Sequence, residues 1–264
     1  MSPRFKRRNY GSGHGYTLDG EKVPGVTTVL DVLDKPALVN WAAKQSAEHA
    51  IEHWAELSEL PLLQRAERIE KARFATNKKA IVRGHRIHEF GDKMATGAAV
   101  EVPDEYRGPA EAYARFLDEW ELETLATETP VCHTDYRYAG TFDAIVHSPR
   151  LGVVMLDIKT GKNVYAETAL QLAAYRFANL MIDDQPMIHT DGAYVAHVLG
   201  DTVDLVPLKQ DKAVLETFLY LLEIFEIWHK RTAWKFKKEA TFDPPVLPPI
   251  YPDQFPHAEL SAAG

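Results

Sequence analysis

Two acids and a lysine occur close together between residues 138 and 159. Asp143 lies within an apolar run, and Asp157 and Lys159 end a second apolar run two residues apart. Carboxylate oxygens bind Mg²⁺ or Mn²⁺, and a lysine beside such an ion suits an anionic substrate. The ion lowers the pKa of a bound water, and the ammonium group stabilises charge that grows on a phosphate. These residue types therefore indicate metal-assisted hydrolysis of a phosphate ester.

The elements expected to position these residues are a strand, a turn, a second strand, a loop and a helix. The two strands are expected at Tyr138–His147 and Leu151–Lys159, with a Ser-Pro-Arg turn between them. A helix is expected from about Tyr165 to Met181. This arrangement brings the two acids and the lysine to the same end of a hairpin.

Side-chain directions within these elements favour one shared site. Because side chains alternate faces along a strand, Asp157 and Lys159 point the same way while Ile158 points into the core. Gln171 and Tyr175 are four residues apart on the expected helix, so they share one face of it. An acid two residues before a lysine is a weak motif by itself, and a surface salt bridge is the alternative interpretation.

The rest of the chain indicates an α/β fold with a central mixed β-sheet flanked by helices and a helical N-terminal portion. We expect a single domain over residues 1–240, with its helical part at about 26–123, its core at about 80–231 and a proline-rich tail at 241–264. The other expected helices are Val26–Leu30, Pro36–Leu57, Pro61–Thr96 with a break near Phe74–Asn77, Asp104–Glu123 and Lys209–Lys230. The other expected strands form a hairpin around Arg8–Tyr16, a strand at Thr127–Asp135 and a hairpin of Gly192–Leu199 and Thr202–Leu208.

One histidine follows two small residues along the last part of the expected 61–96 helix. Ala80, Gly84 and His88 are spaced at four-residue intervals, so they form one line down one helix face. A glycine within a helix costs about 1 kcal/mol relative to alanine, and here it would let the helix press against another element. A buried structural histidine is the alternative interpretation. A zinc hydrolase using His85, His88 and Glu89 is a further alternative, although His-x-x-His-Glu matches neither usual helical zinc pattern.

Four short motifs occur in the order found in a known family. Gly84-x-x-x-His88, Gly140-x-x-Asp143, Asp157-x-Lys159 and Gln171-x-x-x-Tyr175 together resemble the PD-(D/E)XK nucleases. The resemblance is to the RecB-like branch, which includes phage recombination exonucleases and CRISPR-associated RecB-like exonucleases. It spans about Ala80 to Phe177, and Val23–Leu30 also resembles the start of such phage proteins. It implies a restriction-endonuclease-like core.

The resemblance implies a metal centre and a catalytic lysine. His88, Asp143 and Asp157 would be metal ligands, with the backbone carbonyl of Ile158 as a fourth. Lys159 would be the catalytic lysine, and the two acids would serve catalysis through the ion that they hold. The implied cofactor is Mg²⁺ or Mn²⁺, and a histidine ligand would favour Mn²⁺.

The remaining family positions are matched in part. Gln171 and Tyr175 would position DNA or the lysine. Glu128 matches an acid that precedes the first catalytic strand in many relatives, and it is a further candidate ligand. Phe142 stands where the name-giving proline would be, as is usual in the RecB-like branch. Many close relatives hold an iron–sulfur cluster with four cysteines, whereas Cys132 is the single cysteine here, so we expect no such cluster.

Composition and charge restrict the partners. The net charge of −8 argues against a general polyanion binder, but a local basic patch can still steer DNA. Two segments are candidates, the basic N-terminus at Arg4–Arg8 and residues 229–238, and a solvated charged surface is the alternative for each. No apolar run reaches the roughly 18 residues of a membrane span, and no secretory signal is present, so we expect a cytoplasmic protein, in the host cytoplasm if it is phage-encoded.

These observations favour a metal-dependent DNA exonuclease of phage-type recombination, replication or repair. Its expected partner is single-stranded DNA or double-stranded DNA with ends, and a recombination protein is a further candidate partner. A DNA-binding or assembly module that keeps the fold without catalysis is the principal alternative.

Overall fold

The computed structural model describes residues 4–10, 13–95 and 100–234 of the chain, without the side chains of residues 75–81, 85, 88, 91, 92, 94, 95 and 229–234. The chain divides into two compact units, Met1–Leu222 and Glu223–Gly264. The expected proline-rich tail at 241–264 lies outside the described residues, and the expected domain boundary at residue 240 stays a prediction. No described helix is long and apolar enough to cross a membrane.

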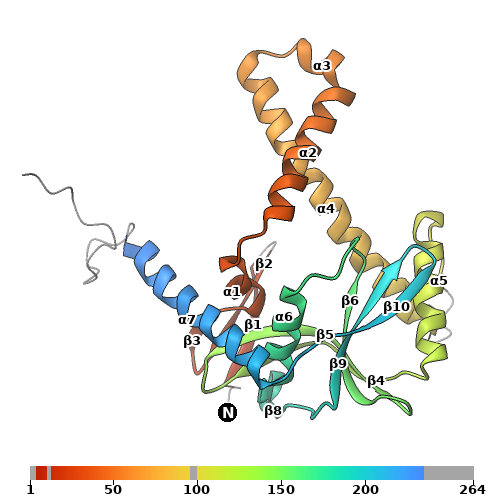
Figure 1. Ribbon diagram of the computed structural model, residues 1–264, viewed down its shortest axis with the longest axis vertical. Helices are drawn as coiled ribbons and strands as arrows, with labels where there is room; N and C mark the ends of the chain where they lie inside the picture. Colours follow the sequence, from red (N-terminus) through yellow and green to blue (C-terminus); the bar gives the residue numbers. More distant parts are fainter. Residues whose placement is uncertain (1–3, 11–12, 96–99, 235–264) are drawn as a thin grey trace, which may run out of the picture. The chain divides into compact units, whose positions relative to one another are not determined.

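A seven-stranded mixed sheet is the centre of the first unit (Figure 1). Strands β6 (Gly152–Lys159) and β9 (Gly192–Leu199) run parallel, whereas the other neighbouring pairs are antiparallel. This sheet, with helices packed against it, confirms the expected α/β class. In spatial order its strands are β10 (Thr202–Pro207), β9 (Gly192–Leu199), β6 (Gly152–Lys159), β5 (Tyr138–Ser148), β4 (Glu123–His133), β7 (Leu180–Met181) and β8 (Gln185–Pro186).

A second, three-stranded sheet lies at the N-terminus and packs against the large one. It consists of β1 (Phe5–Tyr10), β2 (Gly13–Leu18) and β3 (Glu21–Val23). Its apolar residues form a buried cluster with Cys132 and Ala139 of the large sheet. The N–H of Ala139 also donates to the carbonyl of Pro24 at 2.9 Å. The expected N-terminal hairpin is therefore present and is fixed to β5.

Helices cover both faces of the large sheet. Ile87 of α4 and Phe116 of α5 pack against Leu156, Ile158 and the other apolar residues of one face. Met155 and Val195 alternate with these residues and are fully buried on the opposite side. Helix α6 contacts β5, β6 and β9. The described helices are α1 (Val26–Val29), η1 (Leu30–Val32), α2 (Pro36–Glu52), α3 (Trp54–Ser58), α4 (Leu62–Ala95), α5 (Asp104–Glu119), α6 (Glu167–Arg176), η2 (Ile182–Asp184) and α7 (Lys212–Trp234).

Several expected element boundaries were wrong. No break occurs near Phe74–Asn77, because α4 is continuous through that region. Helix α6 ends at Arg176 rather than near Met181, because Leu180–Met181 pairs with β4 as strand β7. The expected 36–57 helix is interrupted at His53, whose backbone leaves the helical region.

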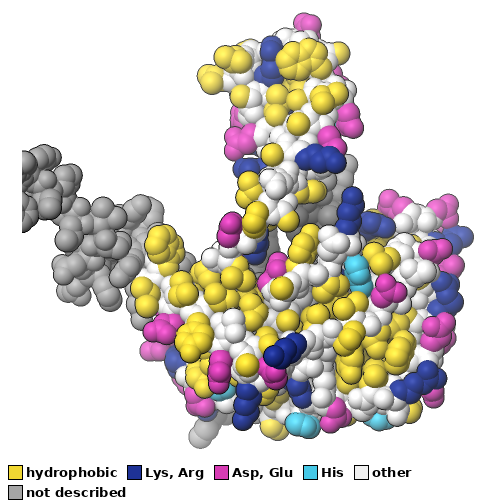
Figure 2. Space-filling view, in the orientation of Figure 1, with side chains coloured by type: hydrophobic (Ala, Val, Ile, Leu, Met, Phe, Trp, Pro, Cys, Tyr) yellow, Lys and Arg dark blue, Asp and Glu magenta, His cyan; other side chains and the backbone are white. Residues whose placement is uncertain are grey.

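Little of the core comes from α2, α3 and the start of α4. Helix α2 has no buried residue. Large apolar side chains at its end and in the following turns are more than half exposed, namely Ile51, Trp54, Leu62 and Leu63. Figure 2 shows hydrophobic side chains at the far end of these helices. The helical N-terminal portion is therefore present, but most of it lies outside the buried core.

Candidate active site

Two carboxylates lie opposite each other where the β5–β6 pairing ends. The antiparallel register runs from Ser148↔Gly152 to Ala144↔Leu156. The next residues on the two strands are Asp143 and Asp157. Continued by one residue, this register sets Asp143 opposite Asp157, and directly opposed residues of antiparallel strands lie close together.

Lys159 forms an ion pair with Asp157. Its Nζ lies 2.9 Å from Oδ1 and 2.6 Å from Oδ2 of the carboxylate. Asp157 is only 2% exposed, whereas the Lys159 side chain is 32% exposed. The lysine therefore balances a buried negative charge and still presents part of its length to solvent. Because the ion pair is partly buried, it is not the surface salt bridge of the alternative interpretation.

Asp143 is oriented by the backbone of the neighbouring strand. Its Oδ2 accepts a hydrogen bond from the N–H of Ile158 at 2.9 Å. Ile158 stands between Asp157 and Lys159, and its side chain packs in the core as expected. The main chain of β6 thus fixes the orientation of the Asp143 carboxylate on β5.

Glu128 on β4 adds a third acid and a strained backbone. It lies between the register pairs Thr127↔Ala144 and Thr129↔Phe142, which sets it opposite Asp143. Its φ is +44°, in the left-handed region that is rarely used outside glycine. Such strain costs about 1–3 kcal/mol and clusters at functional sites. Glu128, Asp143 and Asp157 therefore occupy one row across three adjacent strands.

Tyr175 and Gln171 of α6 lie beside the two acids. Gln171 Nε2 donates to the Tyr175 hydroxyl at 3.2 Å, which confirms that the two residues share a helix face. Burial raises the pKa of Tyr175, and the negative charges of Asp157 and Asp143 raise it further. A Cβ at Gly140 would collide with Cε1 of the Tyr175 ring. The glycine of the Gly140-x-x-Asp143 motif is therefore the contact point for this tyrosine.

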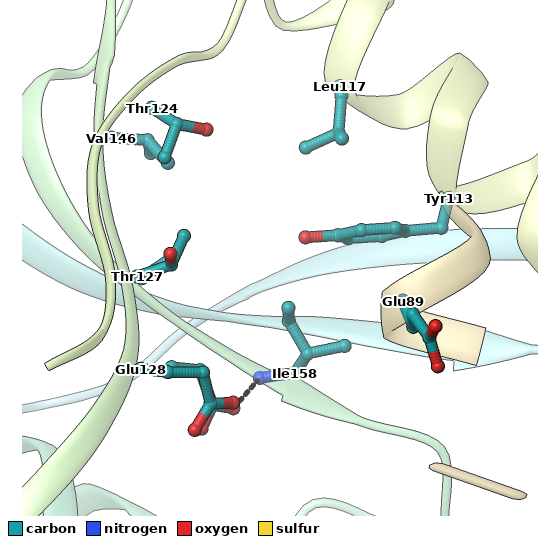
Figure 3. A pocket seen from close by; sticks show the side chains of 10 residues that line it. Glu89, Tyr113, Leu117, Thr124, Thr127, Glu128, Val146 and Ile158 are labelled. Atoms are coloured by element: carbon teal, nitrogen blue, oxygen red, sulfur yellow. Dashed lines mark hydrogen bonds between the residues drawn. The ribbon is translucent and has the colours of Figure 1, made fainter. Parts of the chain in front are cut away.

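A cleft of about 330 Å³ opens next to the row of acids. Figure 3 shows Glu128 and Thr127 on one side of it and Tyr113 and Glu89 on the other. Its lining residues are Glu89, Tyr113, Leu117, Thr124, Thr127, Glu128, Asp143, Ala144, Val146 and Ile158. Tyr113 and Thr127 were not expected here, because only the packing of α5 and β4 brings them to the cleft.

Helix α4 touches the loop that follows Lys159. A Cβ at Gly84 would lie 3.2 Å from Oγ1 of Thr160, so α4 passes close to this loop at the glycine. The close approach expected of Gly84 is confirmed. The side chain of His88, one turn further on, is outside the described part of the chain, and so is that of His85. Glu89 forms ion pairs with Arg86 and Lys93, at 2.9 and 2.8 Å.

The donor atoms at this site are of the types that a hard divalent cation prefers. Asp143, Asp157 and Glu128 would supply carboxylate oxygens and Ile158 a carbonyl oxygen, the ligand types that suit Mg²⁺ and Mn²⁺. Among the described side chains, no three His, Cys, Asp or Glu residues converge closely enough to form a ligand group. The ligand role of His88, whose side chain is not described, stays a prediction.

Two further residues contact segments next to the site and carry no sequence signal of their own. The hydroxyl of Tyr16, on β2, lies 2.8 Å from Oγ1 of Thr141, two residues before Asp143. His197, on β9, is paired in register with Lys159, and its Nε2 donates to the carbonyl of Gly161 at 2.7 Å. Both contacts depend on strands that are distant in sequence.

Two basic segments were candidates for DNA contact. Arg7 and Arg8 are exposed on β1, and Arg7 is in register with Tyr16. Arg4 is paired with Asp19 at 2.7 Å. In the second segment, residues 235–238 lie outside the described residues, as do the side chains of 229–234.

Comparisons with known proteins do not assign this chain to a family. No family model matches it, and no curated protein matches it. Among solved structures, 17 chains match. One of them, titled "Crystal structure of SSO0001", is 12% identical, with a TM-score of 0.27, over 57% of this chain and 87% of that chain. At that TM-score the likeness carries no argument about fold or function.

Proposed function

We propose that this protein is a metal-dependent DNA exonuclease that hydrolyses phosphodiester bonds in phage-type recombination, replication or repair. The observation that carries the proposal is the meeting of Asp143, Asp157 and Lys159 where β5 and β6 stop pairing. The order of four motifs that resemble PD-(D/E)XK nucleases supports the same conclusion. A cytoplasmic location, where such DNA is found, belongs to the proposal.

The acids would hold Mg²⁺ or Mn²⁺, with the Ile158 carbonyl and His88 as further ligands. Such an ion, when bound, lowers the pKa of a coordinated water and neutralises charge on a phosphate. The N–H of Ile158 keeps the Asp143 carboxylate oriented. Fixed donors of this kind need no rearrangement when the substrate arrives.

Lys159 would act directly on the reacting phosphate. Its pairing with both oxygens of Asp157 fixes the ammonium group beside the acids. There it can orient the attacking water and stabilise the negative charge that develops on the phosphate oxygens. Tyr175 and Gln171 would position the lysine or the DNA from α6, where Gln171 donates to the Tyr175 hydroxyl.

Binding of a nucleic acid by this acidic chain would depend on local positive charge near the site. A chain of net charge −8 would repel a polyanion unless local cations offset the acids. The exposed Arg7 and Arg8 of β1 supply such cations on the hairpin that reaches Thr141 through Tyr16. Phosphate contacts of this kind position a strand without reading its sequence.

A time course on end-labelled linear DNA and on circular DNA tests the proposal. The purified protein should degrade linear single- or double-stranded DNA with Mn²⁺ or Mg²⁺ and stop when EDTA is added. Closed circles should persist if the protein is an exonuclease. DNA binding without cleavage under any metal condition would instead favour the non-catalytic module.

A further inference from the structure

A second, smaller cleft lies beside the loop that follows Lys159. It has a volume of about 100 Å³ and is formed by α4, the loop after β6 and the turn between β9 and β10. Arg83 and Lys162 line it, together with Thr160 and Gly161. Thr160, Gly161 and Lys162 directly follow Lys159 in the chain, so the loop that leaves the row of acids forms one wall of this cleft.

The charges in this cleft are of one sign. No described carboxylate lines it. Among the side chains that the structure describes, neither Arg83 nor Lys162 has an ion pair, whereas the neighbouring Arg86 is paired with Glu89. Two cations facing one concave surface repel each other, and an anion placed between them would relieve that repulsion.

The walls of the cleft are fixed by two close contacts. His197, which is 7% exposed, donates to the carbonyl of Gly161 at 2.7 Å and holds the loop against β9. Gly84 lets α4 approach Thr160, where a Cβ would lie at 3.2 Å. The backbones that carry the two cations are therefore held in place before any ligand binds, which lowers the entropic cost of binding.

We propose that Arg83 and Lys162 bind a phosphate group of the nucleic-acid strand, next to the phosphate that is cut. This inference rests on the proposed function, because it assumes that the strand crosses the row of acids. The guanidinium can donate to a phosphate oxygen in a forked geometry, and the ammonium supplies a second charge. Their position beyond Lys159 would fix the register of the strand over Asp143 and Asp157.

The phosphate could be an internal phosphodiester or a phosphate at a 5′ end. The chemistry of recognition is the same for both, since each offers anionic oxygens to the same two cations. Three probes separate them: a linear oligonucleotide with a 5′ phosphate, the same oligonucleotide with a 5′ hydroxyl, and a covalently closed single-stranded circle.

Binding should be measured in EDTA by fluorescence anisotropy, so that no probe is cut. The full-length Arg83→Gln/Lys162→Gln variant is compared with Arg150→Gln/Lys209→Gln, which makes the same charge change. Arg150 lies at the opposite end of the β5–β6 hairpin, and it and Lys209 form exposed ion pairs with Glu121 and Asp211. Thermal unfolding of both variants checks that the fold is kept.

The cleft variant should bind at least about tenfold more weakly than the control, since each lost charged hydrogen bond is worth about that factor. Its log–log salt slope on single strands should fall by about 0.7, the contribution of one lost phosphate contact. An equal loss on all three probes would assign the cleft to an internal phosphodiester. A loss confined to the 5′-phosphorylated probe would assign it to the terminal phosphate.

The proposal is overturned if the cleft and control variants bind alike, or if the wild-type protein binds none of the probes. If the wild-type protein cuts DNA but the cleft variant binds DNA as well as wild type, the phosphate-binding role of the cleft is refuted. The nuclease proposal then stays intact. Binding through the cleft by a protein that never cuts would refute the nuclease proposal alone.

Discussion

The main-chain N–H of Ile158 donates a 2.9 Å hydrogen bond to Oδ2 of Asp143. This bond joins β5 and β6 just past their last register pair, Ala144↔Leu156. The bond links Asp143 to Ile158, the residue that lies between Asp157 and Lys159. The protein itself therefore orients Asp143, so its structural role and its proposed chemical role can be tested separately.

Two substitutions at Asp143 should separate these roles. Asp143→Asn keeps an oxygen that can accept from Ile158, so its free energy of unfolding should stay close to wild type while hydrolysis is lost. Asp143→Ala leaves the Ile158 N–H without this acceptor and should lower the free energy of unfolding by about 1–2 kcal/mol. Urea unfolding of both variants measures the difference, and equal stability would show that the bond contributes nothing.

Gly140→Ala should be destabilising, because the added methyl group would collide with the Tyr175 ring. Overpacking of this kind costs about 1–3 kcal/mol. Gly13→Ala is the matched control, because a Cβ there meets nothing within 4 Å. Chemical denaturation of the two variants should give a large loss for the first and little change for the second. Equal unfolding midpoints would contradict the Gly140–Tyr175 contact.

Cys132 should be inert in the native protein. It is fully buried, and burial raises the pKa of its thiol to about 12. The thiolate is the reactive form, so a thiol reagent at pH 8 should label the cysteine only after denaturant is added. Rapid stoichiometric labelling without denaturant would place the thiol at the surface instead.

His133 should make the fold less stable in mild acid. Burial lowers its pKa below the ordinary 6.5, against a smaller opposing effect of the Asp135 charge. Its Nδ1 accepts from the N–H groups of Asp135 and Tyr136, both at 3.3 Å, and protonation would remove this acceptor.

The sign of this effect follows from proton binding. The unfolded chain takes up the proton more readily than the folded one, so stability is lost as the pH falls below about 6.5 towards the lower folded pKa. Between pH 7 and pH 5.5 the free energy of unfolding should fall less in His133→Gln than in wild type. The exposed His189→Gln is the control, and identical pH dependence in wild type and His133→Gln would contradict this account.

The sequence predicted the local arrangement of the site well. The β5–β6 hairpin, the shared direction of Asp157 and Lys159, and the shared face of Gln171 and Tyr175 all follow from periodicity within short segments. The end of α6 was misplaced because the pairing of Leu180–Met181 with β4, a distant strand, overrides the helical tendency of that segment.

Contacts between distant segments could not be predicted. The bond of His197 to Gly161 requires knowing that β9 runs parallel beside β6. The approach of Tyr16 to Thr141 requires the N-terminal hairpin to pack on β5. The left-handed backbone of Glu128 has no local sign either, because glutamate seldom takes that conformation.

The most direct test of the central claim is the initial rate of DNA hydrolysis by two variants with Mn²⁺ or Mg²⁺. Asp157→Asn removes the charge of the buried acid, and Lys159→Gln removes the ammonium group while keeping a donor for Asp157. Both should lose activity on the order of 10³-fold, with thermal unfolding checked in parallel and Lys209→Gln as the control. Wild-type rates in either variant, or hydrolysis that continues in EDTA, would contradict the account.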